Sequence, residues 1–280
     1  MHKRLGIGGV RFVILALLAA LAVECQSVGR DPSLLARDAL GGSKLAIGRV
    51  VGDDSHRLLA VRDPLGFLRL CRERCSSFSD YRCRFLRQER VQGSLTAEQE
   101  TQVSFRQEPF SVDMRWVRNA DRARRVSYVA GRWSREGREF ALIEPAGILG
   151  LLVPSGVKRD IHSAEMTASS RRSLDQFGFR NTLDLIIKFC EMAKGDPAYD
   201  LRFVGVERLG DRDCYVLERK LPVSPVDQPF PDRLLVIYID REWLVPTGCF
   251  AYADDARREL LGSYVSRAIE FNVGLTDADF

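Results

Sequence analysis

Alternation of apolar and polar residues with a period of two runs through most of the chain, and it constrains the fold more than any other feature. In the clearest case, apolar residues occupy positions 110, 112, 114 and 116. This period places successive side chains on opposite faces of a β-strand. Comparable runs predict ten strands, at 81–88, 98–106, 110–117, 125–130, 138–143, 200–209, 213–221, 233–240, 244–253 and 258–271.

Two segments have a helical period instead. Asp63 followed by Pro64 is typical of a helix start, and apolar residues then recur at helical spacing, which predicts a helix over about 64–78. An apolar stripe over about 182–194 ends before Gly195 and predicts a second helix. Residues 144–180 lie between the two groups of strands, and we expect a long connection there with short helical pieces.

Five strands, a helical interruption and five more strands predict a mainly β (α+β) fold. Short polar turns between consecutive strands favour antiparallel neighbours. The expected architecture is one curved antiparallel sheet that forms an unclosed barrel of about ten strands, with helices covering one opening. We expect one domain over residues 63–280, preceded by a flexible N-terminal segment over residues 26–62.

The first 25 residues have the pattern of a cleaved secretory signal peptide. Basic residues precede an unbroken apolar run over residues 12–23, which is shorter than the roughly 20 residues of a spanning helix. An uncleaved membrane anchor is the alternative. Cys25 stands where a bacterial lipoprotein would carry its acylated cysteine, but Glu24 disfavours acylation because a small residue is expected there. The sequence therefore predicts an extracytoplasmic, periplasmic protein.

The charge of the chain argues against nucleic acid as a partner. The formal net charge is +4. Residues 1–25 carry three basic residues and one acidic residue, so their removal leaves a net charge of +2. A small and dispersed positive charge does not form the basic patch that binds a nucleic-acid backbone.

Six cysteines remain after residue 25, at positions 71, 75, 83, 190, 214 and 249. An even number in an oxidising compartment favours disulfides, with buried free thiols as the alternative. Their spacing provides no second close pair for a zinc site, so we expect no metal.

The sequence gives no sign of catalysis. It contains no Gly-x-Ser-x-Gly elbow and no His-Glu-x-x-His motif. Only two histidines follow residue 25, and they are far apart in the sequence, which disfavours acid–base chemistry centred on histidine. We therefore expect a protein that is not an enzyme and that uses no cofactor.

Apolar and aromatic side chains are dense on the predicted strands. An ordinary core accounts for many of them, but a wide curved sheet has an interior that side chains do not fill completely. Such a cavity would bind an acyl chain with about 0.8 kcal/mol per buried methylene group. A register shift of one residue would turn every inward side chain outward. The residues that we predict to contact a lipid are Val103, Phe105, Val112, Met114, Trp116, Ile237 and Ile239.

Several motifs follow one another along the chain: Tyr81-Arg-Cys-Arg-Phe85, Gln88-Glu-Arg-Val-Gln-Gly93, Phe105-Arg106, Pro109-Phe-Ser-Val112, Met114-Arg-Trp116, Tyr128-Val-Ala-Gly131 and Phe271-Asn-Val-Gly-Leu-Thr-Asp-Ala-Asp-Phe280. Together they resemble a bacterial envelope family, the domain of unknown function 1571. The likeness covers about residues 63–280. The pattern of that family is in turn similar to the lipoprotein-carrier-like group of LolA, LolB and RseB.

This resemblance implies an unclosed antiparallel barrel with helices as a lid over an apolar cavity. It implies a non-enzymatic protein that binds a lipid or an acylated lipoprotein. The alternative is a protein-docking or envelope-sensor module of the RseB kind without a lipid ligand. The expected partners are a lipid or acylated protein, an envelope protein and the membrane surface.

Two further expectations concern the cysteines and the closing motif. Cys83 and Cys214 fall at positions that look cysteine-bearing in the family, so we expect them to form a disulfide. We also expect residues 272–280 to cap the last strand rather than to serve as a docking tail.

Overall fold

A computed structural model of the chain describes residues 55–167, 170–223 and 230–280, all of which belong to the compact unit Ala39–Phe280. The predicted signal peptide and residues 26–54 lie outside the described residues. The strands are β1 (Asp80–Val91), β2 (Ser94–Leu95), β3 (Gln99–Arg106), β4 (Ser111–Arg118), β5 (Ala123–Val129), β6 (Phe140–Pro145), β7 (Val157–Asp160), β8 (Asp200–Leu209), β9 (Arg212–Lys220), β10 (Leu234–Asp240), β11 (Pro246–Tyr252) and β12 (Leu260–Phe271).

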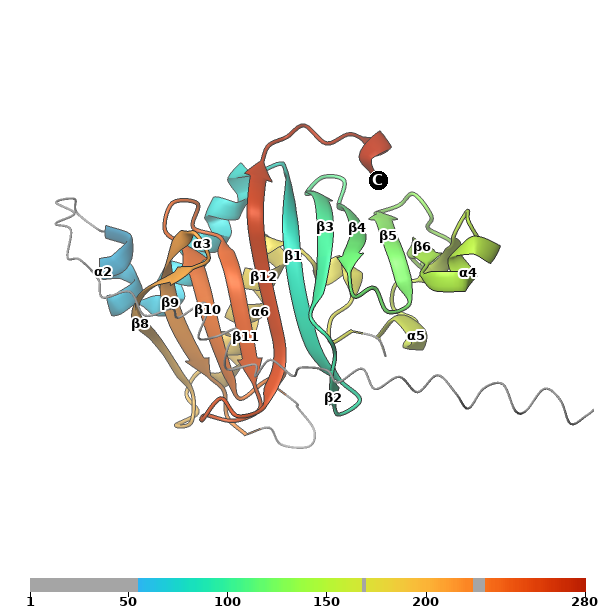
Figure 1. The fold of residues 1–280 in the computed structure, drawn as a ribbon. Helices are drawn as coiled ribbons and strands as arrows, with labels where there is room; N and C mark the ends of the chain where they lie inside the picture. Colours follow the sequence, from blue (N-terminus) through green and yellow to red (C-terminus); the bar gives the residue numbers. More distant parts are fainter. Residues whose placement is uncertain (1–54, 168–169, 224–229) are drawn as a thin grey trace, which may run out of the picture. The chain divides into compact units, whose positions relative to one another are not determined.

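All strands join one antiparallel sheet, in the order β7-β6-β5-β4-β3-β1-β12-β11-β10-β9-β8, with β2 paired to β1 (Figure 1). The end strands β7 and β8 each pair on one side only within the described residues, so the sheet is unclosed, as predicted. All ten predicted strands are present. The sequence pattern missed β2 and β7, which have two and four residues and are too short to show a period of two.

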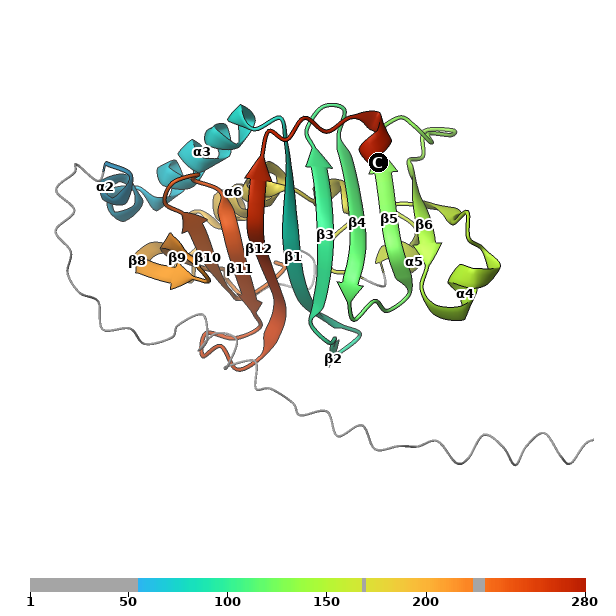
Figure 2. The same cartoon turned by 45° about the horizontal axis from the view of Figure 1, so that its top comes forward.

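The first and last strands lie side by side in the middle of the sheet (Figures 1 and 2). β1 pairs with β12 from Tyr81↔Phe271 to Glu89↔Gly262, and with β3 along its other edge. From this central pair, β3 to β7 continue as one meander and β11 to β8 as another. The β8–β9 turn consists of two residues, and Gly210 adopts φ +65° in it, as a tight hairpin requires.

Helices cover one face of this sheet, which we call the inner face. The helical elements are α2 (Ser55–Arg62), α3 (Pro64–Arg74), η1 (Cys75–Ser77), α4 (Gly147–Leu152), α5 (Ala164–Thr167), η2 (Leu174–Gln176), α6 (Phe179–Ala193) and η3 (Asp277–Asp279). Helix α3 begins as predicted, because the Asp63 carboxylate caps it by accepting the Gly66 N–H at 2.8 Å. Helix α6 also confirms the prediction and buries Leu183, Ile186 and Cys190.

Helix α2 occupies residues that the sequence assigned to the flexible segment. Its apolar pattern is weak, because Leu58 and Val61 are exposed and only Ala60 is buried. The helical period was therefore not visible in the sequence.

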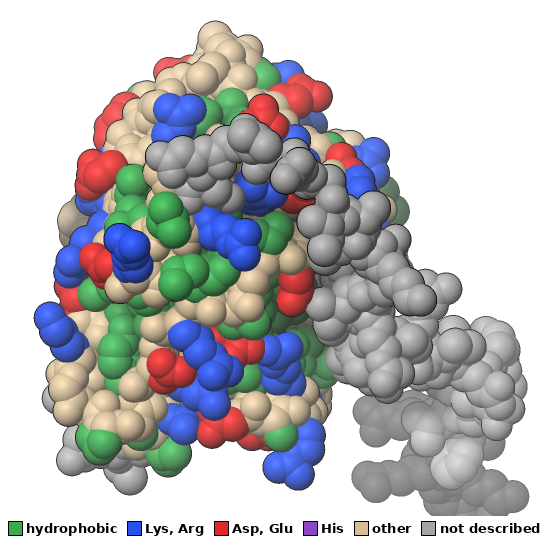
Figure 3. All heavy atoms as spheres, turned by 90° about the vertical axis from the view of Figure 1, so that its left-hand side faces the viewer, with side chains coloured by type: hydrophobic (Ala, Val, Ile, Leu, Met, Phe, Trp, Pro, Cys, Tyr) green, Lys and Arg blue, Asp and Glu red, His purple; other side chains and the backbone are tan. Residues whose placement is uncertain are grey.

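Charged side chains mark the open edge at β8. Arg202 and Asp200 lie on this strand, and Arg202 pairs with the neighbouring strand β9 through Glu218. Figure 3 faces this side and shows hydrophobic side chains interspersed with Lys, Arg, Asp and Glu. Charge on an edge strand opposes unwanted pairing with another chain.

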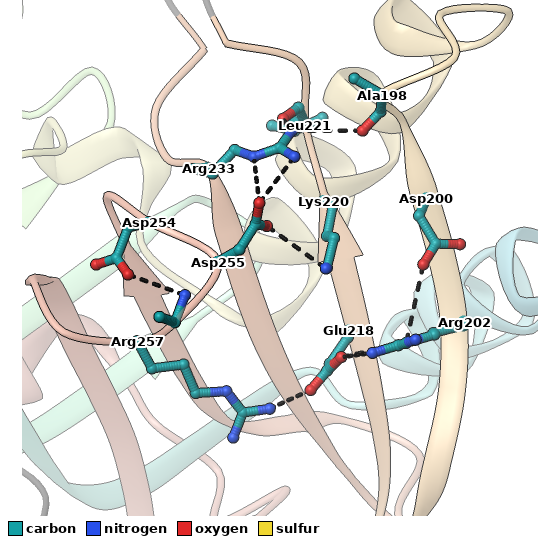
Figure 4. Close-up of polar contacts among 11 residues, drawn as sticks. Ala198, Asp200, Arg202, Glu218, Lys220, Leu221, Arg233, Asp254, Asp255 and Arg257 are labelled. Atoms are coloured by element: carbon teal, nitrogen blue, oxygen red, sulfur yellow. Dashed lines mark hydrogen bonds and ion pairs between the residues drawn. The ribbon is translucent and has the colours of Figure 1, made fainter.

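A charge network ties the β11–β12 connection to the outer face of β8–β10 (Figure 4). The Glu218 carboxylate, 5% exposed, accepts from Arg202 at 2.6 Å and from Arg257. Asp255 pairs with Arg233 at 3.0 Å and with Lys220 at 3.5 Å. Burial alone would raise the pKa of Glu218, but Arg202 and Arg257 together outweigh it and lower that pKa below its ordinary value of 4.5.

The C-terminal segment 272–280 is held on the sheet by contacts with β1 and β3, in line with a structural role for this segment. The buried Asp80 carboxylate accepts backbone N–H groups of Val273, Gly274 and Leu275 at 2.7, 3.2 and 3.3 Å. Further contacts join Arg82 to Asp279, Arg106 to Asp277, and Arg132 to the carbonyl oxygens of Asp277 and Phe280.

We expect Asp80→Asn to destabilise the domain by about 2 kcal/mol, because the three N–H groups lose a charged acceptor. Urea unfolding of the variant and the wild type measures the difference. The control is Asp121→Asn, since the Asp121 side chain is 76% exposed. Equal unfolding free energies for both variants would contradict this role of Asp80.

The ion pairs of Glu218 with Arg202 and Arg257 predict a pH-dependent contribution to the free energy of unfolding. Because the folded-state pKa is lowered, this contribution is present above the ordinary pKa of 4.5 and is lost as the pH falls through the folded-state value. Glu218→Gln should lower the urea midpoint at pH 7, and the difference from the wild type should vanish in strong acid. The control Glu136→Gln changes a carboxylate that is 79% exposed. A difference that stays constant with pH would refute the prediction.

Candidate functional site

A cavity of about 640 Å³ lies on the inner face, within the 300–1,000 Å³ that small-molecule sites occupy. Its floor is formed by β1, β3–β7, β11 and β12. Its cover, which we call the roof, consists of residues 161–166 and 170–178 between β7 and α6. The sheet is wider than α6 alone covers, and the cavity lies where the roof replaces the helix.

The floor is apolar where the meander β4–β7 crosses it. Met114, Val126, Ile143 and Val157 are register partners on consecutive strands, so their side chains form one row across the sheet. All four line the cavity. An elongated apolar ligand would lie along this row.

Aromatic side chains separate the cavity from the core under α6. The Phe85 and Phe177 rings meet edge to face at 5.3 Å, and Tyr81 stacks on Phe179 at 4.6 Å. Gly178 allows the backbone of the roof to approach the strands of the floor closely. It adopts φ +110°, and a Cβ atom there would lie 2.8 Å from the Phe105 ring.

The other end of the cavity is polar. The Glu89 side chain is 3% exposed, and it accepts the Tyr264 hydroxyl at 2.7 Å and the Ser170 hydroxyl at 3.2 Å. Burial and Glu89 raise the pKa of Tyr264, so this phenol remains a hydrogen-bond donor. Arg87 lies 3.5 Å from Glu89. The inward-facing carboxylate is therefore both hydrogen-bonded and paired with a cation.

Gln99 connects this polar end to the apolar floor. Its Oε1 atom accepts from Arg87 at 2.7 Å and from the Trp116 indole N–H at 3.2 Å. The indole ring thus lies at the boundary between polar and apolar lining.

The seven predicted lipid-contact residues all belong to the buried core on the inner face or pack against it, so the strand faces are as predicted. Met114 and Trp116 line the cavity. The other five, Val103, Phe105, Val112, Ile237 and Ile239, are buried in the core shared with α3 and α6 and are not among the lining residues. Contact with a lipid stays a prediction for the set.

The sequence analysis missed lining residues of three kinds. Val126 and Ile143 lie in predicted strands, and their alternation could have placed them on the inner face. Arg87 and Glu89 were not found because charged residues on a strand are normally expected to face water. Phe177 lies in the roof, where the sequence has no period to interpret.

The predicted Cys83–Cys214 disulfide is wrong. The six cysteines of the described residues are buried free thiols. Cys83 packs in the inner-face core, whereas Cys214 belongs to a cluster on the outer face. Their strands are four positions apart in the sheet, or about 19 Å at about 4.8 Å per strand. A disulfide needs Cα atoms within about 7 Å.

An unclosed antiparallel sheet with a covered apolar cavity on one face defines the class of fold. The chain belongs to the family described as protein of unknown function (DUF1571), whose model matches residues 78–280. No curated protein matches the chain.

Several solved structures are similar to the chain at low identity. A DUF1329 family protein from Desulfovibrio piger is 15% identical, with 78% of this chain and 95% of that chain covered and a TM-score of 0.39. A putative outer membrane lipoprotein-sorting protein domain from Vibrio parahaemolyticus is 12% identical, with coverages of 77% and 94% and a TM-score of 0.38. A chain of the Pseudomonas aeruginosa MucA/MucB complex is 16% identical, with coverages of 78% and 60% and a TM-score of 0.42.

Two negative findings concern the described ranges alone. No group of three or more His, Cys, Asp or Glu side chains there could hold a metal ion. Among those same residues, no helix has the length and apolar character to cross a membrane.

The six buried thiols should be unreactive in the folded protein. Burial raises the pKa of all six, to about 12 for Cys83 and about 11 for Cys214, so the reactive thiolate is scarce. We expect N-ethylmaleimide to leave them unlabelled in the folded protein and to label all six in denaturant without reductant. Mass spectrometry of the digested protein shows which cysteines carry the label. A cysteine that is labelled only after reduction would reveal a disulfide.

Proposed function

We propose that this protein is a non-enzymatic, extracytoplasmic protein that binds the acyl chain of a lipid or of an acylated protein in the inner-face cavity. The observation that carries the proposal is the cavity of about 640 Å³ with its continuous apolar row of four side chains from β4 to β7. The predicted signal peptide supports the extracytoplasmic location.

Burial of an acyl chain supplies a large favourable contribution to the free energy of binding. Ten buried methylene groups contribute about 8 kcal/mol at about 0.8 kcal/mol each. Loss of translational and rotational freedom opposes binding by several kcal/mol. Because the sheet and the roof already form the cavity, little further ordering is needed, and each additional buried methylene group strengthens binding.

Native mass spectrometry of the exported chain, purified without strong detergent, tests the proposal. We expect a bound mass that can be extracted into organic solvent. Ile143→Trp places an indole in the cavity and should weaken binding by about ten-fold or more, which corresponds to about 1.4 kcal/mol. Leu142→Trp is the matched control, because it changes the neighbouring residue on the opposite face of β6.

Met114→Trp is a second blocking variant from another strand. Circular dichroism checks that each variant is folded. A chain that stays free of ligand after incubation with envelope lipids, or an Ile143→Trp variant that binds as the wild type does, would contradict the proposal.

A second candidate function is docking of a protein partner. Helix α4 favours it, since Ile148, Leu151 and Leu152 are 77%, 81% and 72% exposed beside cavity-lining Pro145 and Ala146. The same measurement separates the two functions: a stoichiometric protein complex without lipid supports docking, and a lipid adduct supports the cavity.

A further inference from the structure

Arg172, in the cavity lining, has no carboxylate partner among the described residues. Arg172 is partly buried and lines the cavity from the roof. Its guanidinium carbon lies 5.5 Å from the centroid of the Tyr264 ring. Within the described residues, no carboxylate oxygen lies within ion-pair distance of its guanidinium nitrogens. The planar group therefore rests on an aromatic ring and retains its hydrogen-bond donors for another group.

Glu89 and Asp175 are engaged with other partners. Both Glu89 carboxylate oxygens accept hydroxyl hydrogen bonds, and Arg87 is its cationic neighbour. Asp175 accepts the Ser173 hydroxyl at 2.5 Å and lies 3.5 Å from His162. Because the positive charge of Arg87 balances the negative charge of Glu89, Arg172 adds one uncompensated positive charge at the polar end of the cavity.

We infer that the ligand is an amphiphile with an anionic headgroup, a carboxylate or a phosphate, that Arg172 binds while the apolar tail lies along Met114, Val126 and Ile143. This inference rests on the proposed function, since the tail occupies the same cavity. A guanidinium forms two parallel hydrogen bonds to either anion, which suits a headgroup at a fixed position. The Trp116 side chain, between Gln99 and the apolar floor, lies where headgroup and tail would meet.

Charge at the other rim is less suited to this role. Arg122 is 74% exposed and lies 3.9 Å from Asp121, and Arg159 pairs with Glu165 at 3.3 Å. Exposed and paired cations attract an anion weakly in water, because solvent and salt screen them. The geometry therefore assigns the headgroup to the end of the cavity at β1 and β12.

The test compares cis-parinaric acid with its uncharged methyl ester, by probe fluorescence, on the exported chain. We expect the acid to bind about ten-fold more tightly than the ester. Arg172→Gln should remove most of this preference and leave the affinity for the ester unchanged. Arg172→Lys should retain part of it because the charge is kept. Arg135→Gln, which removes a cation that is 81% exposed, is the control and should behave as the wild type.

Equal binding of acid and ester by the wild type would overturn the inference while leaving the proposed function intact. An equal loss of both probes in Arg172→Gln would also overturn it, since the preference for the acid would then persist without Arg172. Failure of both probes to bind the wild type would instead reject the proposed function and this inference with it. Displacement of the probe by dodecanoate or by dodecyl phosphate then shows which headgroup is preferred, and either result supports the inference.

Discussion

The hydrogen-bonded pairing of β1 with β12 is the constraint on which the rest of the structure depends. It joins the meander β3–β7 to the meander β8–β11 in one sheet. At one end of the pair, Asp80 holds the C-terminal segment, and at the other end Glu89 of β1 meets Tyr264 of β12. The same two strands therefore carry the anchor of the chain end and the polar end of the cavity.

The cavity exists because two different covers share one inner face. Helix α6 is amphipathic and fills its half with a regular stripe, from Leu183 to Cys190. The roof has only short helical pieces and cannot fill the other half with a regular stripe. Wide curved sheets need more side-chain volume than their own strands provide. The irregular cover over β4–β7 leaves this volume open.

Much of the fold, and less of the site, could be predicted from the sequence. Period-two alternation located ten strands, and the capping pair Asp63-Pro64 located α3. Alternation also gave the correct face for Met114 and Trp116, but it cannot distinguish a side chain that packs in the core, such as Ile237, from one that lines a cavity. The polar end depends on tertiary neighbours, since Arg87 and Glu89 have the appearance of solvent-facing residues. The predicted Cys83–Cys214 disulfide was wrong because cysteine positions shared within a family do not show on which face of the sheet each side chain lies.

The central position of β1 and β12 has a consequence for the order in which the domain forms. About 170 residues separate the end of β1 from the start of β12, so the pairing at the centre of the sheet closes a very long loop. Closure entropy rises slowly with loop length, but non-local pairing slows folding strongly. During synthesis or refolding, each meander can form its own hairpins while β1 keeps one unpaired edge. That edge remains open to proteases and to other strands until residues 260–271 arrive.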